Sequence, residues 1–173
     1  IYIYFMKISF HKLLLTKRFP LAISRGVNAE SYNVFVGVKE NDLIGWGESA
    51  PCKSEGAINT EEVILQLQKL IDVNIENISI YEIERIAREM KISPCAYAGL
   101  DIALWDLKAK KAKMPLHELL GLPLPKSKTS LTIGIMSPNS VKERIPLLFE
   151  GSSAKFLKEK LGSNQGLEAD KAM

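Results

Sequence analysis

The sequence predicts an α+β capping domain, built from a three-stranded antiparallel meander and helices, followed by the start of an α/β unit. Alternating apolar residues indicate strands near the N-terminus, and apolar stripes at helical spacing follow them. A proline-rich stretch then separates these elements from a strand–helix–strand pattern. We therefore expect an α+β domain over 6–121, a linker over 122–128 and an incomplete α/β unit over 129–173.

The meander is predicted from three segments in which apolar and polar residues alternate. Residues 7–15 form the first, "YNVFVGV" at 32–38 forms the second, and "ENDLIGWGE" at 40–48 turns back into the third. The segment 16–30 lies between the first two and contains a proline and a glycine. We expect it to be a loop of about fifteen residues, and loops of that length are usually functional.

Four helices are expected after the meander. Residues 60–72 carry one apolar stripe, and "SIYE" at 79–82 is a capping box that precedes a second stripe. Ser93 and Pro94 supply the N-cap and the first position of a third helix, one side of which consists of small residues that allow another element to approach closely. "PLHELLG" at 115–121 indicates a short fourth helix ended by glycine.

After the linker, the pattern changes to strand, helix and strand. The strands are "SLTIGI" at 130–135 and "KFLKEKLG" at 155–162, and the helix between them is "SPNSVKERIPLLFEG" at 137–151. Two strands joined by a helical crossover pair in parallel, so this segment predicts a parallel sheet.

Lys158 and Lys160 stand two apart on the second of these strands, so their side chains share one face. Spacing alone leaves two interpretations open. An exposed edge strand carries lysines that discourage aggregation. Alternatively, the pair is catalytic, because a lysine acts as a base only when neutral, and a second cation or a metal ion nearby favours the neutral form. Active sites of parallel barrels gather at strand ends of this kind.

Composition disfavours several function classes. The 23 Lys and Arg against 20 Asp and Glu give a net charge of +3 that is spread along the chain, which does not indicate nucleic-acid binding. No apolar run approaches the ~20 residues of a membrane-spanning helix. Cys52 and Cys95 lack the spacing of a metal site or a disulfide framework, which predicts a reducing, cytoplasmic compartment. Met6 reads as a natural start, so residues 1–5 are expected to be upstream read-through.

Other polar residues carry weaker signals, and we expect structural roles for them. Asp101 and Asp106 lie five apart on the third predicted helix, about 140° around its axis, so they cannot share one site. His11 and His117 have no partner at ligand spacing. "GWGES" at 45–49 has glycine where a nucleophile elbow needs serine.

Arg25 lies in the predicted loop beside Ser24 and Gly26. Most arginines in loops are solvated. Near a small-molecule site, however, a loop arginine is a natural clamp for a carboxylate, because its guanidinium matches two oxygens.

Several motifs, taken in order, resemble the muconate-lactonizing and dipeptide-epimerase branch of the enolase superfamily. They are "GWGESAP" at 45–51, "AYAGLDIALWDLKAKKAKMPLHELLG" at 96–121, "TSLTIGI" at 129–135 and "LKEKLGS" at 157–163. "ISRG" at 23–26 and "GSNQGLEADKAM" at 162–173 are most similar to the dipeptide epimerases. The resemblance spans the chain from Met6 to Met173 and favours the catalytic interpretation of the lysine pair.

The resemblance implies a capping domain followed by a modified TIM-like barrel, with the lysine pair at the end of the second barrel strand. Lys160 would be the acid/base for one face of the substrate α-carbon, and Lys158 would neighbour the substrate carboxylate. Arg25, with Ser24 beside it, would lie in a capping loop and bind a substrate carboxylate or carbonyl. Thr132, on the first barrel strand, would contact a dipeptide.

The resemblance also implies a magnesium ion that stabilises the enediolate formed on proton removal. Its acidic ligands, and a second lysine for the opposite face, are expected beyond residue 173. We therefore expect the N-terminal part of a dipeptide epimerase that carries out 1,1-proton transfer and is inactive as this fragment. A cycloisomerase or o-succinylbenzoate synthase of the same branch, and a non-catalytic remnant, stay as alternatives. Homo-oligomer formation by the full-length protein is left open.

Three further features follow from the resemblance. Residues 52–56 would form a second capping loop. Glu159 stands between the two lysines, where the family usually has an apolar residue facing the helical shell of the barrel. Pro146 lies inside the expected first barrel helix, where a proline costs ~3 kcal/mol unless a kink is accommodated.

Overall fold

The computed structural model describes residues 6–173, which form two compact units. The first unit contains the chain up to residue 15 together with residues 31–124. The second unit contains residues 16–30 and 125–173. The expectation that residues 1–5 precede the natural start lies outside the described residues.

The first unit is built on a three-stranded sheet with the strand order β1-β2-β3, which confirms the predicted meander. The strands are β1 (Lys7–Ile23), β2 (Gly26–Glu40) and β3 (Leu43–Ser49). β2 and β3 pair antiparallel, so that Val34 lies opposite Ser49 and Val38 lies opposite Gly45. Every second residue of β2 in this stretch is a fully buried valine, as the alternation predicts.

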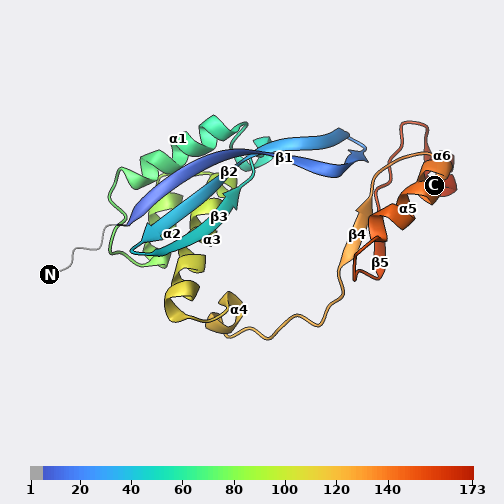
Figure 1. Cartoon of the computed structure of the whole chain (residues 1–173). Helices are drawn as coiled ribbons and strands as arrows, with labels where there is room; N and C mark the ends of the chain where they lie inside the picture. Colours follow the sequence, from blue (N-terminus) through green and yellow to red (C-terminus); the bar gives the residue numbers. More distant parts are fainter. Residues whose placement is uncertain (1–5) are drawn as a thin grey trace. The chain divides into compact units, whose positions relative to one another are not determined.

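Three helices lie against one face of this sheet (Figure 1). They are α1 (Thr60–Ile71), α2 (Ile80–Glu89) and α3 (Pro94–Ala112). The Ser79 side chain accepts the N–H of Glu82, so the predicted start of α2 is confirmed. The core between helices and sheet includes nine side chains with no exposed surface: Val34, Val36, Val38, Val63, Leu67, Leu70, Ala96, Leu100 and Ala103. Two short helices, η1 (Lys53–Glu55) and α4 (Leu116–Leu119), complete this unit.

Helix α3 lies directly on strand β3 because the facing residues lack side chains. A Cβ atom on Gly45 would lie 2.1 Å from the carbonyl oxygen of Ala103, and one on Gly47 would lie 2.0 Å from that of Gly99. Both distances are far below van der Waals contact, so only glycine fits at either position. The predicted close approach at the small face of α3 is confirmed.

A buried serine fixes the helix at this contact. Ser49 has no exposed surface, and its hydroxyl donates to the carbonyl oxygen of Ala96 at 2.8 Å and accepts the N–H of Gly99 at 3.1 Å. A buried hydroxyl is costly unless it is hydrogen-bonded. These two bonds satisfy it only when α3 is correctly placed along β3.

In the second unit, two short strands lie side by side and pair in parallel (Figure 1), which confirms the strand–helix–strand prediction. They are β4 (Ser130–Ile133) and β5 (Phe156–Glu159), and the helix between them in the chain is α5 (Pro138–Phe149). α5 continues through Pro146, whose carbonyl oxygen accepts the N–H of Glu150 at 3.1 Å. A further short helix, α6 (Leu167–Ala172), has no counterpart among the predicted elements.

The prediction of a loop over residues 16–30 is wrong. β1 continues to Ile23 and β2 begins at Gly26, so the segment is the far half of a β-hairpin, and its turn consists of Ser24 and Arg25. Gly26 has a φ of +135°, a conformation that side chains rarely allow.

Most of this hairpin half is exposed, which explains why its strands are hard to predict. Alternating hydrophobicity marks strands with one buried face, and residues 16–30 have little of it. Pro20 also favours a loop over a strand, because proline is typical of loops and turns. Lys17 Nζ donates to Asn28 Oδ1 across the two strands.

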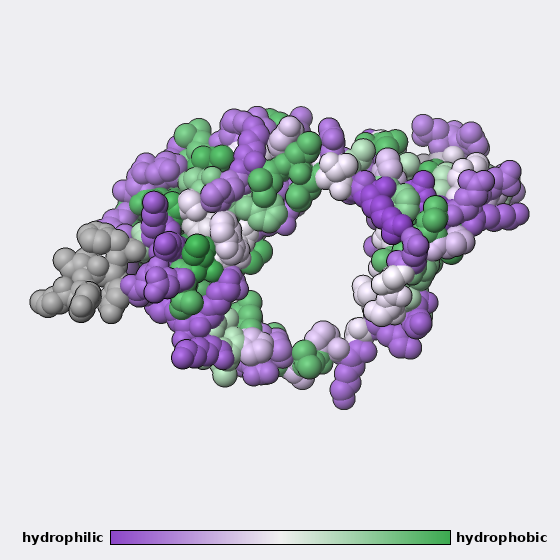
Figure 2. Space-filling model, in the orientation of Figure 1, coloured by the Kyte–Doolittle hydropathy of each residue, from purple (hydrophilic) through white to green (hydrophobic). Residues whose placement is uncertain are grey.

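Hydrophilic and hydrophobic residues are interspersed on the visible face of the molecule in Figure 2. Within residues 6–173, no helix is both long and apolar enough to cross a membrane.

Replacing Gly47 with alanine tests the contact between α3 and β3. We expect Gly47→Ala to reduce the free energy of unfolding by about 3 kcal/mol, because the added methyl group meets a helix carbonyl oxygen that cannot move without separating helix from strand. Chemical denaturation followed by circular dichroism measures the change.

Gly37→Ala is the matched control in the same sheet. A Cβ there would meet Ser9 Oγ at 2.8 Å and the Trp46 ring at 3.0 Å, and these are side-chain atoms that can shift. Equal losses of stability in the two variants would contradict the assignment.

Candidate active site

All five predicted site residues belong to the second unit. Ser24 and Arg25 form the hairpin turn, Thr132 lies on β4, and Lys158 lies on β5. Lys160 directly follows β5. Their functional roles stay predictions, and the structure gives their placement.

Thr132 and the two lysines occupy one face of the β4–β5 pair. Thr132 lies directly opposite Lys158 in the parallel register, and paired residues of a parallel ladder point to the same side. The N–H of Lys160 donates to the carbonyl oxygen of Ile133 at 3.1 Å, so the ladder continues through Lys160. Lys158 is exposed and Lys160 is half-buried.

Glu159 points to the opposite face from the lysines because successive side chains of a strand alternate. Its side chain is exposed. The carboxylate therefore keeps its contact with water, and the desolvation that would make a carboxylate costly at this position does not arise within the described residues.

The hairpin meets the end of β4 by direct backbone contact. The N–H of Ile135 donates to the carbonyl oxygen of Ala22 at 2.9 Å. A Cβ on Gly134 would lie 2.7 Å from the backbone nitrogen of Ala22 and 2.8 Å from its oxygen. Gly134 thus allows the hairpin to lie against the strand end that follows Thr132.

The hairpin turn meets the segment that follows β5. Gly162 has a φ of +100°, and a Cβ there would lie 3.1 Å from the Cβ of Ser24. Gly162 is only two residues beyond Lys160. The structure therefore brings Ser24 close to the end of the strand that carries the lysine pair, and Arg25 is exposed beside it.

Helix α5 contacts the hairpin further from the turn. The guanidinium of Arg144 stacks 4.1 Å from the centroid of the Phe19 ring, and Arg18 pairs with Glu150 at 2.8 Å. Both residues of the ion pair are exposed, so the pair adds little stability by itself. Together with the Ala22 contact, the stacking defines where the hairpin lies in this unit.

The turn after β5 is held by a residue that the sequence analysis did not single out. Asp170, on α6, accepts the N–H of Gly162 through Oδ2 and the N–H of Ser163 through Oδ1, both at 2.9 Å. One acidic residue in a short helix gives no signal of this role. Gly134 does give one, because a glycine within a strand pattern indicates close backbone approach.

The second predicted capping loop, residues 52–56, belongs to the first unit. It contains the short helix η1, and Cys52 forms an isolated β-bridge with Ala57. The Cys95 thiol lies 3.4 Å from the carbonyl oxygen of Glu55, and a hydrogen bond with Ser54 lowers the pKa of Cys52. Both cysteines are free thiols.

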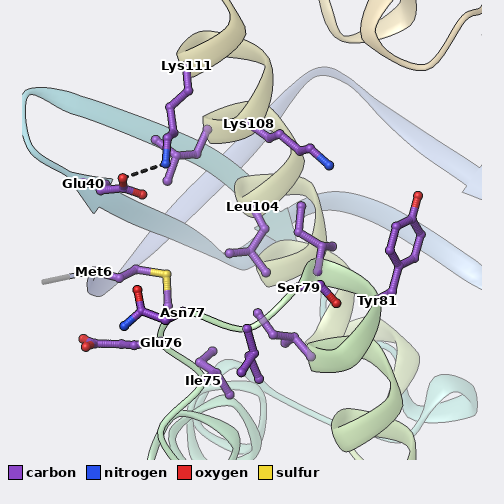
Figure 3. A pocket seen from close by; sticks show the side chains of 14 residues that line it. Met6, Glu40, Ile75, Glu76, Asn77, Ser79, Tyr81, Leu104, Lys108 and Lys111 are labelled. Carbon is purple, nitrogen blue, oxygen red and sulfur yellow. Dashed lines mark hydrogen bonds and ion pairs between the residues drawn. The ribbon is translucent and has the colours of Figure 1, made fainter. Parts of the chain in front are cut away.

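A pocket of about 460 Å³ in the first unit contains none of the predicted site residues (Figure 3). Side chains of Ile75, Ile83 and Leu104 give it an apolar lining, and Lys111 at its rim pairs with Glu40 at 2.6 Å.

The two aspartates of α3 take part in structural contacts. Asp106 accepts the backbone N–H of Trp46 at 2.8 Å and pairs with Lys110 at 2.6 Å. Burial raises the pKa of Asp101 above its usual value, and the nearby Glu84 carboxylate adds to the increase. A hydrogen bond from Trp105 acts in the opposite direction.

The described residues do not fit a magnesium site. Within residues 6–173, no group of three or more His, Cys, Asp or Glu side chains is placed to hold a metal ion.

Comparison with known proteins gives a family match over residues 7–121, to the model described as mandelate racemase / muconate lactonizing enzyme, N-terminal domain. A hydrophobic dipeptide epimerase from Flavobacteria bacterium (strain MS024-2A) is 55% identical over 168 residues, which are 97% of this chain and 48% of the relative. One from Roseobacter litoralis is 45% identical over 168 residues, with the same shares. The chain thus spans about half the length of the curated relatives it matches.

A solved structure of similar fold is the dipeptide epimerase from Methylococcus capsulatus, complexed with Mg and the dipeptide L-Arg-D-Lys. The TM-score is 0.78 at 27% sequence identity, and the match covers 98% of this chain and 48% of that chain.

Replacing Gly134 tests the contact between hairpin and strand. We expect Gly134→Ala to displace the hairpin from β4, because the methyl group would meet main-chain atoms of Ala22. The amide of Ile135 would lose its acceptor, and its hydrogen exchange, followed by NMR, should become roughly tenfold faster or more. Gly151→Asn, at an open position with a φ of +70° that asparagine tolerates, should leave this amide unchanged. Unchanged exchange in Gly134→Ala would contradict the contact.

The raised pKa of Asp101 predicts a pH-dependent effect. Because the folded state binds this proton more tightly than the unfolded state, the ionised carboxylate opposes folding above the usual aspartate pKa of about 3.9. Asp101→Asn should therefore raise the thermal midpoint at pH 7, by an amount that shrinks as the pH falls toward 4. The effect is small because solvent screens this partly exposed group. Asp106→Asn, which removes the ion-pair partner of Lys110, should not gain stability at pH 7; a gain in both variants would rule out this explanation.

Proposed function

Because the chain belongs to the mandelate racemase / muconate lactonizing enzyme family of the enolase superfamily, we propose that it is part of an epimerase that acts on dipeptides. The reaction is a 1,1-proton transfer at the carbon next to a carboxylate. The observation that carries the proposal is the common face of Thr132, Lys158 and Lys160 at the end of a parallel strand pair, with the Ser24 turn beside it. The similarity to hydrophobic dipeptide epimerases over nearly the whole chain supports it.

In this proposal Lys160 is the acid/base for one face of the substrate α-carbon. It removes the proton from that face in one direction of the reaction and delivers a proton to it in the other, while a second acid/base on the opposite face completes the transfer. Its backbone lies in the strand ladder, so its position is set by the sheet. Lys158 stands two residues earlier on the same face, roughly 7 Å along the strand. Its ammonium group faces the substrate carboxylate and contributes positive charge where negative charge develops during proton removal.

The hairpin turn and β4 supply the substrate contacts. Arg25 is exposed at the turn and offers a guanidinium to a carboxylate or carbonyl group of the substrate. Ser24 and Thr132 offer hydroxyl groups, and a hydroxyl both donates and accepts hydrogen bonds, as a peptide group requires. We propose hydrophobic dipeptides as the substrate class, since two relatives that match 97% of this chain are named hydrophobic dipeptide epimerases.

We further propose that the whole protein uses magnesium, as the Methylococcus capsulatus structure contains it. The described residues do not supply its ligands, so the chemistry derived for this chain is limited to the lysines and the substrate contacts.

The domain assignment is part of the same proposal. Residues 6–121 form the capping domain, 122–128 form the linker, and 129–173 begin a TIM-like barrel, with the hairpin half at 16–30 packed on the barrel strands. The parallel pairing of β4 and β5 supports a barrel origin. The free thiols of Cys52 and Cys95 support a cytoplasmic location.

A chimeric enzyme tests the function. Residues 6–173 of this chain replace the matching half of the Flavobacteria relative, and the interconversion of the two α-carbon epimers of a hydrophobic dipeptide is followed by NMR. We expect epimerisation, and we expect Lys160→Met to reduce its rate roughly 100-fold or more, because a positioned acid/base contributes that much. Lys155→Met, an exposed lysine near the start of the same strand, should leave the rate unchanged. An active relative with an inactive chimera would overturn the proposed function, and full activity of Lys160→Met would overturn the role of Lys160.

A further inference from the structure

We propose that Asp170 is a positioning residue, whose carboxylate holds the turn that carries the chain away from Lys160. The effect on catalysis rests on the proposed function, whereas the effect on the turn does not. Asp170 lies on α6, ten residues after Lys160. It acts through the backbone of Gly162 and Ser163 and not by contact with the reacting atoms.

The contact is a two-point clamp. The two carboxylate oxygens of Asp170 accept N–H groups from two successive residues, Gly162 and Ser163, each at 2.9 Å. Hydrogen bonds to an ionised acceptor are roughly twice as strong as neutral ones. Two bonds from one planar group also fix the orientation of the turn, because rotating either peptide would lengthen one bond.

The turn needs such an acceptor because it begins where the strand ladder stops. The N–H of Lys160 still bonds to the carbonyl oxygen of Ile133, whereas the N–H groups of Gly162 and Ser163 bond to the Asp170 side chain instead. Gly162 also takes a φ of +100°, which turns the chain sharply. Within the described residues, the Asp170 carboxylate therefore accepts the two N–H groups that no longer bond to a neighbouring strand.

The same turn touches the hairpin at Ser24, through the close contact at Gly162. A displaced turn would thus move two parts of the proposed site together: the backbone next to Lys160 and the wall formed by the hairpin tip. A displacement of about 1 Å in a catalytic group lowers a rate roughly 100-fold. Asp170 is therefore expected to act on the rate of proton transfer more than on substrate affinity.

Amide hydrogen exchange of the 173-residue chain tests the clamp without any need for activity. In Asp170→Ala, exchange at both Gly162 and Ser163 should become roughly tenfold faster or more, because each N–H loses a charged acceptor. In Asp170→Asn, one acceptor oxygen remains, so only one of the two amides should be accelerated strongly. Glu168→Gln is the matched control on α6, because among residues 6–173 the Glu168 carboxylate pairs only with the exposed Lys171. It should leave both amides unchanged.

Kinetics of the chimeric enzyme test the consequence for catalysis. We expect Asp170→Ala to lower kcat by roughly 10- to 100-fold while KM changes less than about threefold, with Asp170→Asn in between and Glu168→Gln unchanged. A loss of overall stability alone would instead lower the amount of folded enzyme. It would leave kcat per folded molecule unchanged, and it would not accelerate exchange at Gly162 and Ser163 selectively.

The outcomes separate the two proposals. Unchanged exchange at Gly162 and Ser163 in Asp170→Ala overturns the clamp. An active parent chimera whose kcat is unaffected by Asp170→Ala, or equally affected by Glu168→Gln, overturns the positioning role and leaves the proposed function intact. An inactive parent chimera overturns the proposed function and the catalytic part of this inference, while the exchange experiment still decides the clamp.

Discussion

Helix α3 and strand β3 approach until main chain meets main chain, and the first unit depends on this contact. Gly45 and Gly47 leave no room for a side chain against the helix carbonyls, and the buried hydroxyl of Ser49 is satisfied only at this distance. With the helix so close, the valines of β2 and Leu100 of α3 are all completely buried.

The second unit uses the same device where chemistry is proposed. Gly134 brings the backbone of Ala22 against the end of β4, and Gly162 brings Ser24 against the end of β5. The hairpin is thus located by main-chain atoms of Ala22 at the end of β4 and by the Cβ atom of Ser24 beyond the end of β5. A turn placed in this way holds the proposed substrate contacts in a defined position relative to the lysine face.

Sequence reasoning reached those features that depend on periodicity or on local chemistry. Alternation located the valines of β2, the Ser79 cap located the start of α2, and spacing placed Lys158 and Lys160 on one face. It failed for residues 16–30, because an exposed hairpin half carries no alternation and derives its support from residues more than a hundred positions away. The role of Asp170 was not predicted for a related reason. Its partners are backbone N–H groups, which every sequence contains and no motif identifies.

The division of the hairpin between two units affects how the chain folds during synthesis. Residues 16–30 leave the ribosome early, yet the Gly134 and Ile135 backbone that they pack against lies roughly 110 residues later, which at 5–20 residues per second is a delay of roughly 5–20 s. The near half of the hairpin can join the first sheet within that interval, whereas its far half stays uncovered. Lys17, Arg18 and Arg25 lie in this far half, and charged residues on an exposed strand pair discourage edge pairing with other chains.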